Sequence, residues 1–474
     1  MGQSILDTLA GQSEQVEKGL QVLTANGNTL SDRVVKGDAF TIEGNRRAVR
    51  VPIQTTMPMS GYKTNLNGGV FSRGRAVEAQ FYSLGHLPFA YSYEITIESL
   101  VMDKGNVIDA NQQIFSKSAA VANEWQDIFF HGNGNGILAG GDGGSTTANV
   151  TSGGVTCTTY TFADPNDNLG VANLVEGMQV EVYSSDLDTR RSPSSGTNIT
   201  FIKSIDWGNK IVLLNQQIAS AAAGDVLAIA GLKDPAAGFP SGFSRGASPA
   251  LGSFSSTYPA AGTTNAAGYQ GDAFRHGFPY ACDNDTTRTF FQLAKSDVPQ
   301  LLPSVLSANA PYNAAFMIQI QNAIAMKRPD ADALGALIGI APLAQYDAIW
   351  RSSVSLIQPI QQVGGEYGKL IDGTPSDGGL SATFTIGGVT CHKSRRQPAN
   401  RIDFIAPKQI GKCVGAQLQL LKQGTANGFQ LLTDPTTGVA TSTLLMHMFD
   451  SWDYGYRDPG MFASITNLQK PAGY

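Results

Sequence analysis

The strongest constraint on the fold of this chain is a pair of runs, residues 47–54 and 77–82, in which apolar and polar side chains alternate. A period of two places every second side chain on the same face, which is the pattern of a strand with one covered face. Residues 55–75, between the two runs, are rich in Gly and Asn. We therefore predict an extended two-stranded hairpin with a loose tip, followed by a further strand over 91–98.

A hairpin of this kind needs something to lie on, because two strands bury too little surface to offset the ordering of their backbones. Its support is either the body of its own subunit or a neighbouring copy of the chain, and the sequence leaves both open. The charged residues of the hairpin are candidates for contacts between subunits, with solvated loop charge as the alternative for each. These candidates are Arg46, Arg47, Arg50, Lys63, Arg73, Arg75 and Glu78.

A long helix is predicted after the hairpin, over residues 109–132. Apolar residues recur there at helical spacing, Asp109 and Gln112 form a capping pair, and Gly132 provides a stop. Such an apolar stripe is typical of a helix packed on a sheet. Short runs punctuated by Gly turns follow from 140 to 231, and they predict a small inserted β-barrel or sandwich.

The rest of the chain combines loops, helices and strands. Residues 234–271 are rich in Ala, Gly, Ser and Pro, which predicts a long surface connector. The predicted elements beyond it are helices over 312–327 and near 343–353, a hairpin over 384–391, and a strand over 443–456 that is buried on both faces. We therefore predict an α+β protein.

Composition narrows the classes of function. A hydrophobic fraction of 42% predicts a folded chain, and 53 Gly and 22 Pro favour many turns and loops. A net charge of −5 gives no bulk attraction to nucleic acid. The four Cys residues are far apart, so we expect reduced, buried thiols. Because the sequence shows neither a signal-type start nor a long apolar stretch, we expect a protein made and used in soluble form, in a cytoplasm.

The motifs that could carry chemistry lack the context that chemistry needs. Ser244 stands in a G-x-S-x-G pattern, but its neighbours predict neither the strand nor the helix of a nucleophile elbow. The five His residues lack metal-ligand spacing. The basic run HKSRR, residues 392–396, is expected to be a solvated or interface face. We therefore predict no catalytic, cofactor or metal site, and no enzyme.

Three stretches, taken in order with the hairpin, carry a resemblance to a known family. They are NEWQDIFFHGNGNGILAG at 123–140, FTIGGVTCHKSRRQPANRIDFI at 384–405 and MFDSWDYGYRDPGMFASITNL at 448–468. They resemble, respectively, the exit of the long helix, the recurrent hairpin and the closing strand of tailed-bacteriophage major capsid proteins with the Hong Kong 97-like fold. The likeness covers most of the chain outside about 140–285, and the inserted β unit departs from it.

The resemblance implies a division of the chain into named parts. These are an N-terminal arm (1–40), an extended β-hairpin or E-loop with the start of the P-domain (41–100), the spine helix of the P-domain (101–139), an inserted β-barrel or sandwich (140–235), a connector (236–285), an A-domain (286–400) and a return to the P-domain (401–474).

The same resemblance implies a structural role. Copies of the chain would assemble through hexamers and pentamers into an icosahedral shell around the double-stranded DNA of a phage, with only non-specific contact to that DNA. Portal and scaffold proteins are implied partners, decoration proteins are possible ones, and no membrane is involved. The implied location is the virion, with the host cytoplasm during assembly. The alternatives are an encapsulin-like shell protein, a phage tail or decoration protein, and, from another class, a serine hydrolase using Ser244.

Overall fold

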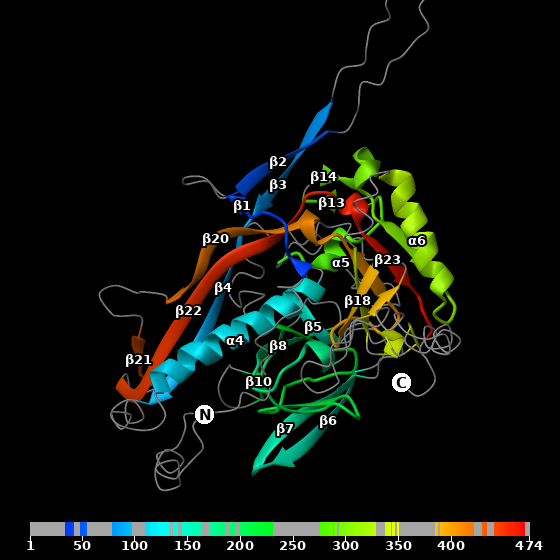
Figure 1. Cartoon of the computed structure of the whole chain (residues 1–474). Coiled ribbons are helices and arrows are strands. Elements are labelled where there is room, and N and C mark those ends of the chain that lie inside the picture. Colours follow the sequence, from blue (N-terminus) through cyan, green and yellow to red (C-terminus); the bar gives the residue numbers. More distant parts are fainter. Residues whose placement is uncertain are drawn as a thin grey trace, which may run out of the picture.

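A computed structural model describes most of the chain. The described residues are 34–41, 48–54, 78–96, 110–132, 134, 136–140, 145–162, 171–184, 190–194, 200–230, 275–287, 289–291, 293–328, 337–342, 344–346, 348–349, 384–386, 389–420, 429–433 and 440–469. They form three main sheets, a separate hairpin and two long helices (Figure 1). This content confirms the α+β class.

The first sheet has five strands, with β22 (Ala440–Tyr456) at its centre. β22 pairs with β20 (Ile410–Leu420), β21 (Phe429–Thr433) and β4 (Leu87–Thr96), and β20 pairs in parallel with β1 (Phe40–Thr41). The strand predicted over 443–456 is therefore present, and its described side chains from 450 to 456 are all buried. Burial on both faces is thus confirmed for that part.

The long helix α4 (Ala110–His131) lies along this sheet (Figure 1). The contact is aromatic: the ring centroids of Phe89 on β4 and Trp125 on α4 are 5.0 Å apart, and Tyr91, Ala122 and Met448 form a small buried cluster. The predicted helix and its packing on a sheet are confirmed. Its predicted capping residue Asp109 lies outside the described residues.

The second sheet has eight strands and lies in the part of the chain where the sequence predicts a small β-barrel or sandwich. Its strands are β5 (Ile137–Gly140), β6 (Ser145–Ser152), β7 (Val155–Phe162), β8 (Gln179–Tyr183), β9 (Arg190–Arg191), β10 (Thr200–Asp206), β11 (Ile211–Leu214) and β12 (Val226–Ile229). The order is β5-β12-β8-β10-β11-β7-β6, with β9 beside β8. β10 pairs with β8 through Thr200 and Phe201, and with β11 from Ile202 onward, with a register shift in the second pairing; it therefore joins the two halves of the sheet.

The third sheet has six strands in the order β15-β23-β19-β16-β18-β17. Their bounds are β15 (Ser304–Ser307), β16 (Ile338–Pro342), β17 (Phe384–Ile386), β18 (Val389–Ser394), β19 (Ile402–Ile405) and β23 (Ala463–Thr466). The predicted hairpin over 384–391 is confirmed as β17 and β18, and the predicted helix as α6 (Ala314–Lys327), which Asn313 caps by accepting a hydrogen bond from the Ala315 N–H. Near 343–353, residues 344–346 and 348–349 are helical.

Shorter elements complete the described chain. They are the hairpin strands β2 (Ala48–Gln54) and β3 (Ala79–Gly85), the pair β13 (Thr289–Phe290) and β14 (Leu293–Ala294), the helix α5 (Phe278–Ala281), and the 3₁₀ turns η1 (Val171–Asn173), η2 (Lys295–Asp297), η3 (Pro299–Leu301), η5 (Pro407–Gln409) and η6 (Pro459–Met461).

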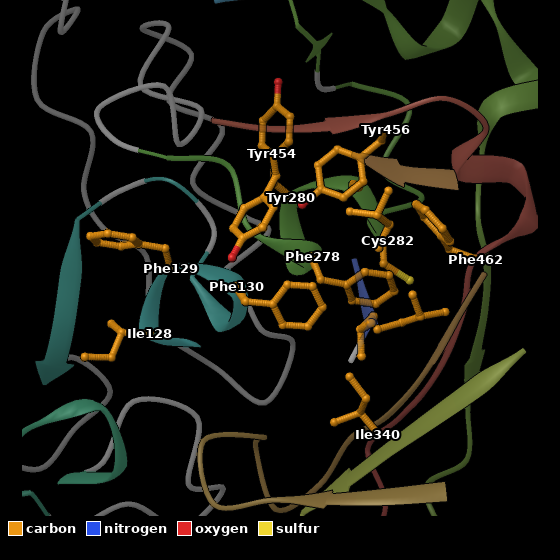
Figure 2. Close-up of a cluster of buried hydrophobic side chains, with 14 of the residues drawn as sticks. Ile128, Phe129, Phe130, Phe278, Tyr280, Cys282, Ile340, Tyr454, Tyr456 and Phe462 are labelled. Atoms are coloured by element: carbon orange, nitrogen blue, oxygen red, sulfur yellow. The ribbon is translucent and has the colours of Figure 1, made fainter. Parts of the chain in front are cut away.

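The core of the molecule lies where α4, α5 and the ends of β22 and β23 meet. Figure 2 shows Phe130, Phe278, Tyr456 and Phe462 turned toward one another, and the rings of Phe278 and Phe462 are 5.2 Å apart. Gly277 lets the chain just before α5 lie against the end of α4, because a Cβ there would lie 2.1 Å from the carbonyl oxygen of Gly132. Residues 275–282, assigned from the sequence to the end of the connector, are thus part of the buried core.

Candidate functional site

The hairpin that the sequence predicts is formed by β2 and β3, which pair antiparallel without a bulge. Val51 faces Tyr82 across the pair, while Pro52 faces Phe81 on the opposite face. Directly opposed residues share a face of the ribbon. One face therefore holds Val51 and Tyr82 and packs on the core, and the other holds Pro52 and Phe81.

The base of the hairpin is fixed to its own subunit. The Tyr82 hydroxyl donates a hydrogen bond to the carbonyl oxygen of Tyr456 over 2.6 Å, and its ring lies edge-on to Phe290 with centroids 5.3 Å apart. Both Tyr82 and Leu84 are fully buried, and this burial raises the pKa of the Tyr82 hydroxyl. Of the two supports considered from the sequence, the described part of the inner face therefore rests on the subunit's own body.

The outer face of the hairpin is open. Phe81 is 59% exposed, and Arg50 and Pro52 on the same face are also exposed. Of the seven predicted interface residues, the structure describes Arg50, which lies on this face, and Glu78, which is exposed just before β3. Arg46, Arg47, Lys63, Arg73 and Arg75 lie outside the described residues, so their role stays a prediction. We call the face formed by Arg50, Pro52, Phe81 and Ser83 the outer hairpin face.

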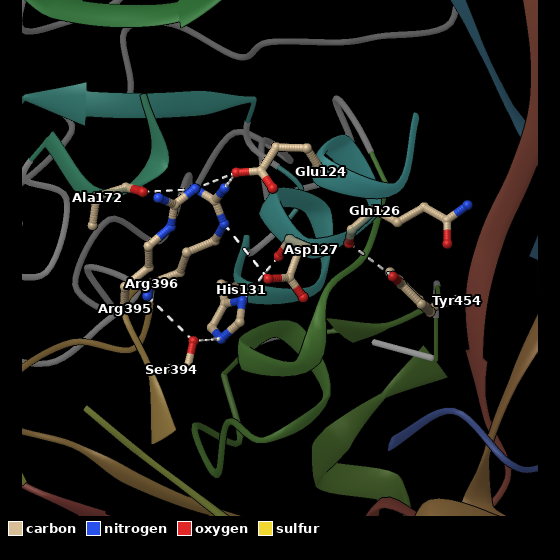
Figure 3. A network of polar contacts seen from close by, with 9 residues as sticks. All are labelled: Glu124, Gln126, Asp127, His131, Ala172, Ser394, Arg395, Arg396 and Tyr454. Carbon is tan, nitrogen blue, oxygen red and sulfur yellow. Dashed lines mark hydrogen bonds and ion pairs between the residues drawn. The ribbon is translucent and has the colours of Figure 1, made fainter. Parts of the chain in front are cut away.

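A buried network of charges holds the end of α4, and the sequence did not predict it. Arg396 follows β18 and is 3% exposed; its guanidinium bonds the carboxylate of Glu124 on α4 and donates to the Ala172 carbonyl oxygen over 2.6 Å (Figure 3). Arg395 reaches the same carboxylate from a half-exposed position. Burial lowers the pKa of Arg396 to about 9. The expectation that HKSRR is a solvated or interface face is therefore wrong for Arg396.

The same network extends along the last turn of α4. His131 bonds the carbonyl oxygen of Asp127 through Nδ1 at 2.8 Å and the Ser394 hydroxyl through Nε2 at 3.0 Å (Figure 3). Ala172 lies in η1, between β7 and β8 of the second sheet, whereas Ser394 lies in β18 of the third sheet. The network thus joins three parts of the molecule at a single point.

A second buried ion pair holds the chain where it re-enters the core. Arg275, 1% exposed, donates to Asp450 Oδ1 over 2.5 Å and to the carbonyl oxygen of Leu87 over 3.2 Å. Its guanidinium carbon lies 4.0 Å from the ring centroid of Trp452 and 4.9 Å from that of Phe129. A buried charge is costly unless it is paired. The Asp450 carboxylate and the surrounding aromatic rings therefore offset the cost of burying the Arg275 guanidinium.

The cysteines are packing residues. All four are free and buried, as the sequence predicts. Burial raises the pKa of Cys282 and of Cys391 to about 12 and that of Cys413 to about 11. Since the thiolate is the reactive form, these thiols are inert at neutral pH.

We expect a small thiol reagent to label none of the four Cys residues in the native protein at pH 8, and all four after unfolding. The raised pKa values also predict how the free energy of unfolding depends on pH. Because the thiols ionise near pH 9 in the unfolded chain and only near pH 11 to 12 in the folded one, their burial costs no stability below pH 9. The folded state then loses stability as the pH rises from 9 toward 11 to 12. Mass spectrometry counts the labels, and denaturant unfolding at pH 8 and pH 10 checks the sign. Rapid native labelling would contradict the burial.

The described residues hold no group of three or more His, Cys, Asp or Glu side chains that could bind a metal ion. Ser244 lies outside them. Within the described part of the chain, no helix is both long and apolar enough to cross a membrane. The features that stand out are therefore an exposed hairpin face and two buried charge clusters that tie distant segments together.

No protein-family model matches the chain, and no curated protein matches it. Among solved structures, it is similar to the capsid asymmetric unit of cyanophage A-1(L), at 8% identity over 96% of this chain and 97% of that one, with a TM-score of 0.47. It is also similar to the capsid of a native GTA particle (8% identity, 96% and 95% covered, TM-score 0.43) and to the mature capsid of bacteriophage PhiM1 (10%, 96% and 91%, TM-score 0.39). Each of these three structures is a capsid.

Proposed function

We propose that this chain is a major capsid protein, whose copies assemble through hexamers and pentamers into the icosahedral shell that encloses the double-stranded DNA of a tailed phage. The observation that carries the proposal is the two-sided hairpin formed by β2 and β3. Its inner face is bound to its own subunit, and its outer hairpin face presents a large aromatic side chain to solvent.

An exposed aromatic beside a Pro on a two-stranded ribbon is the kind of surface that a protein partner covers. Aromatic residues are enriched in protein interfaces, and Phe81 lies directly opposite Pro52 on this face. A contact between this face and a different surface of an identical chain is heterologous, and heterologous contacts close into rings and shells when their rotation allows. The anchored base fixes the direction in which the hairpin extends, so every copy presents the face in the same way.

The net charge of the chain is compatible with a shell that encloses DNA. A net charge of −5 favours a shell that contacts DNA non-specifically over a protein that condenses DNA, which requires clustered Lys and Arg. Portal and scaffold proteins, and decoration proteins on the outside, are the partners we propose. The virion is the proposed location, with assembly in the host cytoplasm. The function proposed is structural and not enzymatic.

Electron microscopy of the purified protein in negative stain tests the proposal. We expect uniform closed particles, or pentamers and hexamers, whose proportion rises with protein concentration. Trimers or open rings would favour the tail or decoration alternative. A chain that stays monomeric at all concentrations and ionic strengths would contradict a shell role.

Replacing Phe81 with serine is expected to reduce the yield of assembled particles about tenfold or more, because an aromatic anchor in the centre of an interface contributes about 2 kcal/mol or more. The folded monomer should keep its thermal midpoint, since Phe81 is 59% exposed there. Sedimentation measures the assembled fraction. Met326→Ser, which removes an 88% exposed side chain from α6, is the matched control. Equal assembly of the two variants would contradict a role for the outer hairpin face.

A further inference from the structure

The two edges of the eight-stranded sheet are protected to different degrees. β5 forms one edge; it has four residues, its pairing with β12 contains a register shift, and Ile137, Leu138 and Ala139 are buried. β6 forms the other edge and has eight residues, all paired with β7 without a shift. Short edge strands, bulges and cover are the devices by which proteins prevent edge-to-edge pairing, and β5 has all three.

β6 has none of these devices in the described structure. Its sequence, STTANVTS, holds no charged residue and no Pro, the two residue classes that most often block an edge. Residues 148–151 are exposed on both faces of the ribbon, and Val150 is 46% exposed. Among the described strands, β7 is the one that pairs with β6. Its other edge therefore offers a row of backbone donors and acceptors to an incoming strand.

The geometry limits where such a strand can bind. At the turn between β6 and β7, the Lys203 ammonium group already donates to the Ser152 carbonyl oxygen over 3.2 Å and to the Ser152 hydroxyl over 3.0 Å. The edge that is exposed in the described structure therefore runs from Ala148 to Thr151. It lies at the end of the molecule opposite the β2–β3 hairpin (Figure 1), so a partner on it leaves the outer hairpin face free.

We propose that β6 pairs antiparallel with β6 of a second copy of this chain, about a two-fold axis, so that the eight-stranded sheets of two subunits become continuous. A second copy fits because the strand is uncharged: in any antiparallel register, no two like charges come to face each other. Its β-branched residues, Thr146, Thr147, Val150 and Thr151, are the types that stabilise cross-strand pairs. The inference rests on the proposed function only for the supply of many copies at high local concentration.

Charge substitutions on exposed positions of β6 test this pairing. Ala148→Lys with Val150→Lys adds two charges on one face of the edge, where the symmetric strand would bring like charges together. The matched control, Thr156→Lys with Ser204→Lys, adds the same charge at exposed positions of β7 and β10, which are interior strands of the same sheet. Sedimentation and hydrogen exchange of the amides of residues 145–152 are measured on the full chain.

We expect the wild type to associate and its β6 amides to exchange about tenfold or more slowly in the assembly than in the dissociated subunit. The Lys pair should lose this protection and the control should keep it. A glutamate pair, Ala148→Glu with Val150→Glu, should by itself also lose the protection of the β6 amides. When it is mixed in equal amounts with the Lys pair, the β6 amides should again be protected from exchange. Such rescue identifies a second copy as the partner, because an unrelated partner would not be restored by mixing.

Failure of this inference is distinguishable from failure of the proposed function. Closed particles whose β6 amides exchange as in the free subunit, or a Lys pair that assembles like its control, overturn the β6 pairing and leave the shell in place. Dimers that the Lys pair abolishes, without any closed particle, retain the pairing and overturn the shell. A wild type that never associates overturns both.

Discussion

Replacing Arg396 with methionine is expected to lower the free energy of unfolding of the unassembled protein by about 3–5 kcal/mol. The substitution removes the guanidinium that bonds Glu124, a residue 5% exposed. Among the described residues, the half-exposed Arg395 is then the one cation left beside that buried carboxylate. It also removes the hydrogen bond to the carbonyl oxygen of Ala172. Denaturant unfolding followed by intrinsic fluorescence measures the loss.

The neighbouring residue provides the matched control. Arg395→Met removes a cation that contacts the same carboxylate from a side chain that is 47% exposed, so we expect a loss of at most about 1 kcal/mol. Combining Arg396→Met with Glu124→Gln should recover part of the stability, because the unpaired buried charge is then gone. Equal losses for Arg396→Met and Arg395→Met would show that burial of the pair has no energetic consequence.

The second large effect is expected at Arg275. Arg275→Met should also cost about 3–5 kcal/mol, because Asp450 loses its cationic partner while it stays 3% exposed. Asp450 keeps hydrogen bonds from the Tyr91 hydroxyl at 3.2 Å and the Trp452 indole N–H at 3.0 Å, which places the loss toward the lower end. Thermal unfolding monitored by near-ultraviolet circular dichroism is well suited, since Trp452 lies against the guanidinium.

Arg457 is the control for this variant. It lies 3.9 Å from the fully solvated carboxylate of Asp38 and is itself 41% exposed, so Arg457→Met should cost at most about 1 kcal/mol. Adding Asp450→Asn to Arg275→Met should restore part of the loss, as removal of both charges does for other buried pairs. If Arg275→Met unfolds at the same temperature as Arg457→Met, the buried ion pair and the aromatic cage together contribute no net stability.

Local patterns predicted the elements whose signal is contained within a few residues. The alternation in 47–54 and 77–82 predicted β2 and β3, and the helical spacing before Gly132 predicted α4. In each case the spacing of the apolar residues alone indicates which face of the element is buried. Turn signals likewise predicted strands between residues 140 and 231. These strands do not decide whether the sheet closes into a barrel, and they do not test the predicted division of the chain into domains.

Features that depend on distant partners could not be predicted. Arg396 and Glu124 are 272 residues apart, so the run HKSRR gives no local sign that one of its cations is buried against a helix. Residues 275–282 follow a stretch rich in Gly, Ser and Pro, and that composition concealed a buried segment with Phe278 and Tyr280. The sequence holds one sign that this segment is buried, namely the position of Arg275 just before the aromatic residues Phe278 and Tyr280.

The central position of β22 has a consequence for the order of events during synthesis. This strand provides the pairing partner of β4, and Tyr82 is bonded to Tyr456, 374 residues further along the chain. Contacts of such sequence separation form late. The ribosome must therefore have translated beyond residue 456 before the hairpin can be anchored, so a nascent chain cannot present its outer face in the correct direction. Any contact made through the outer hairpin face is thereby postponed until residue 456 has been translated.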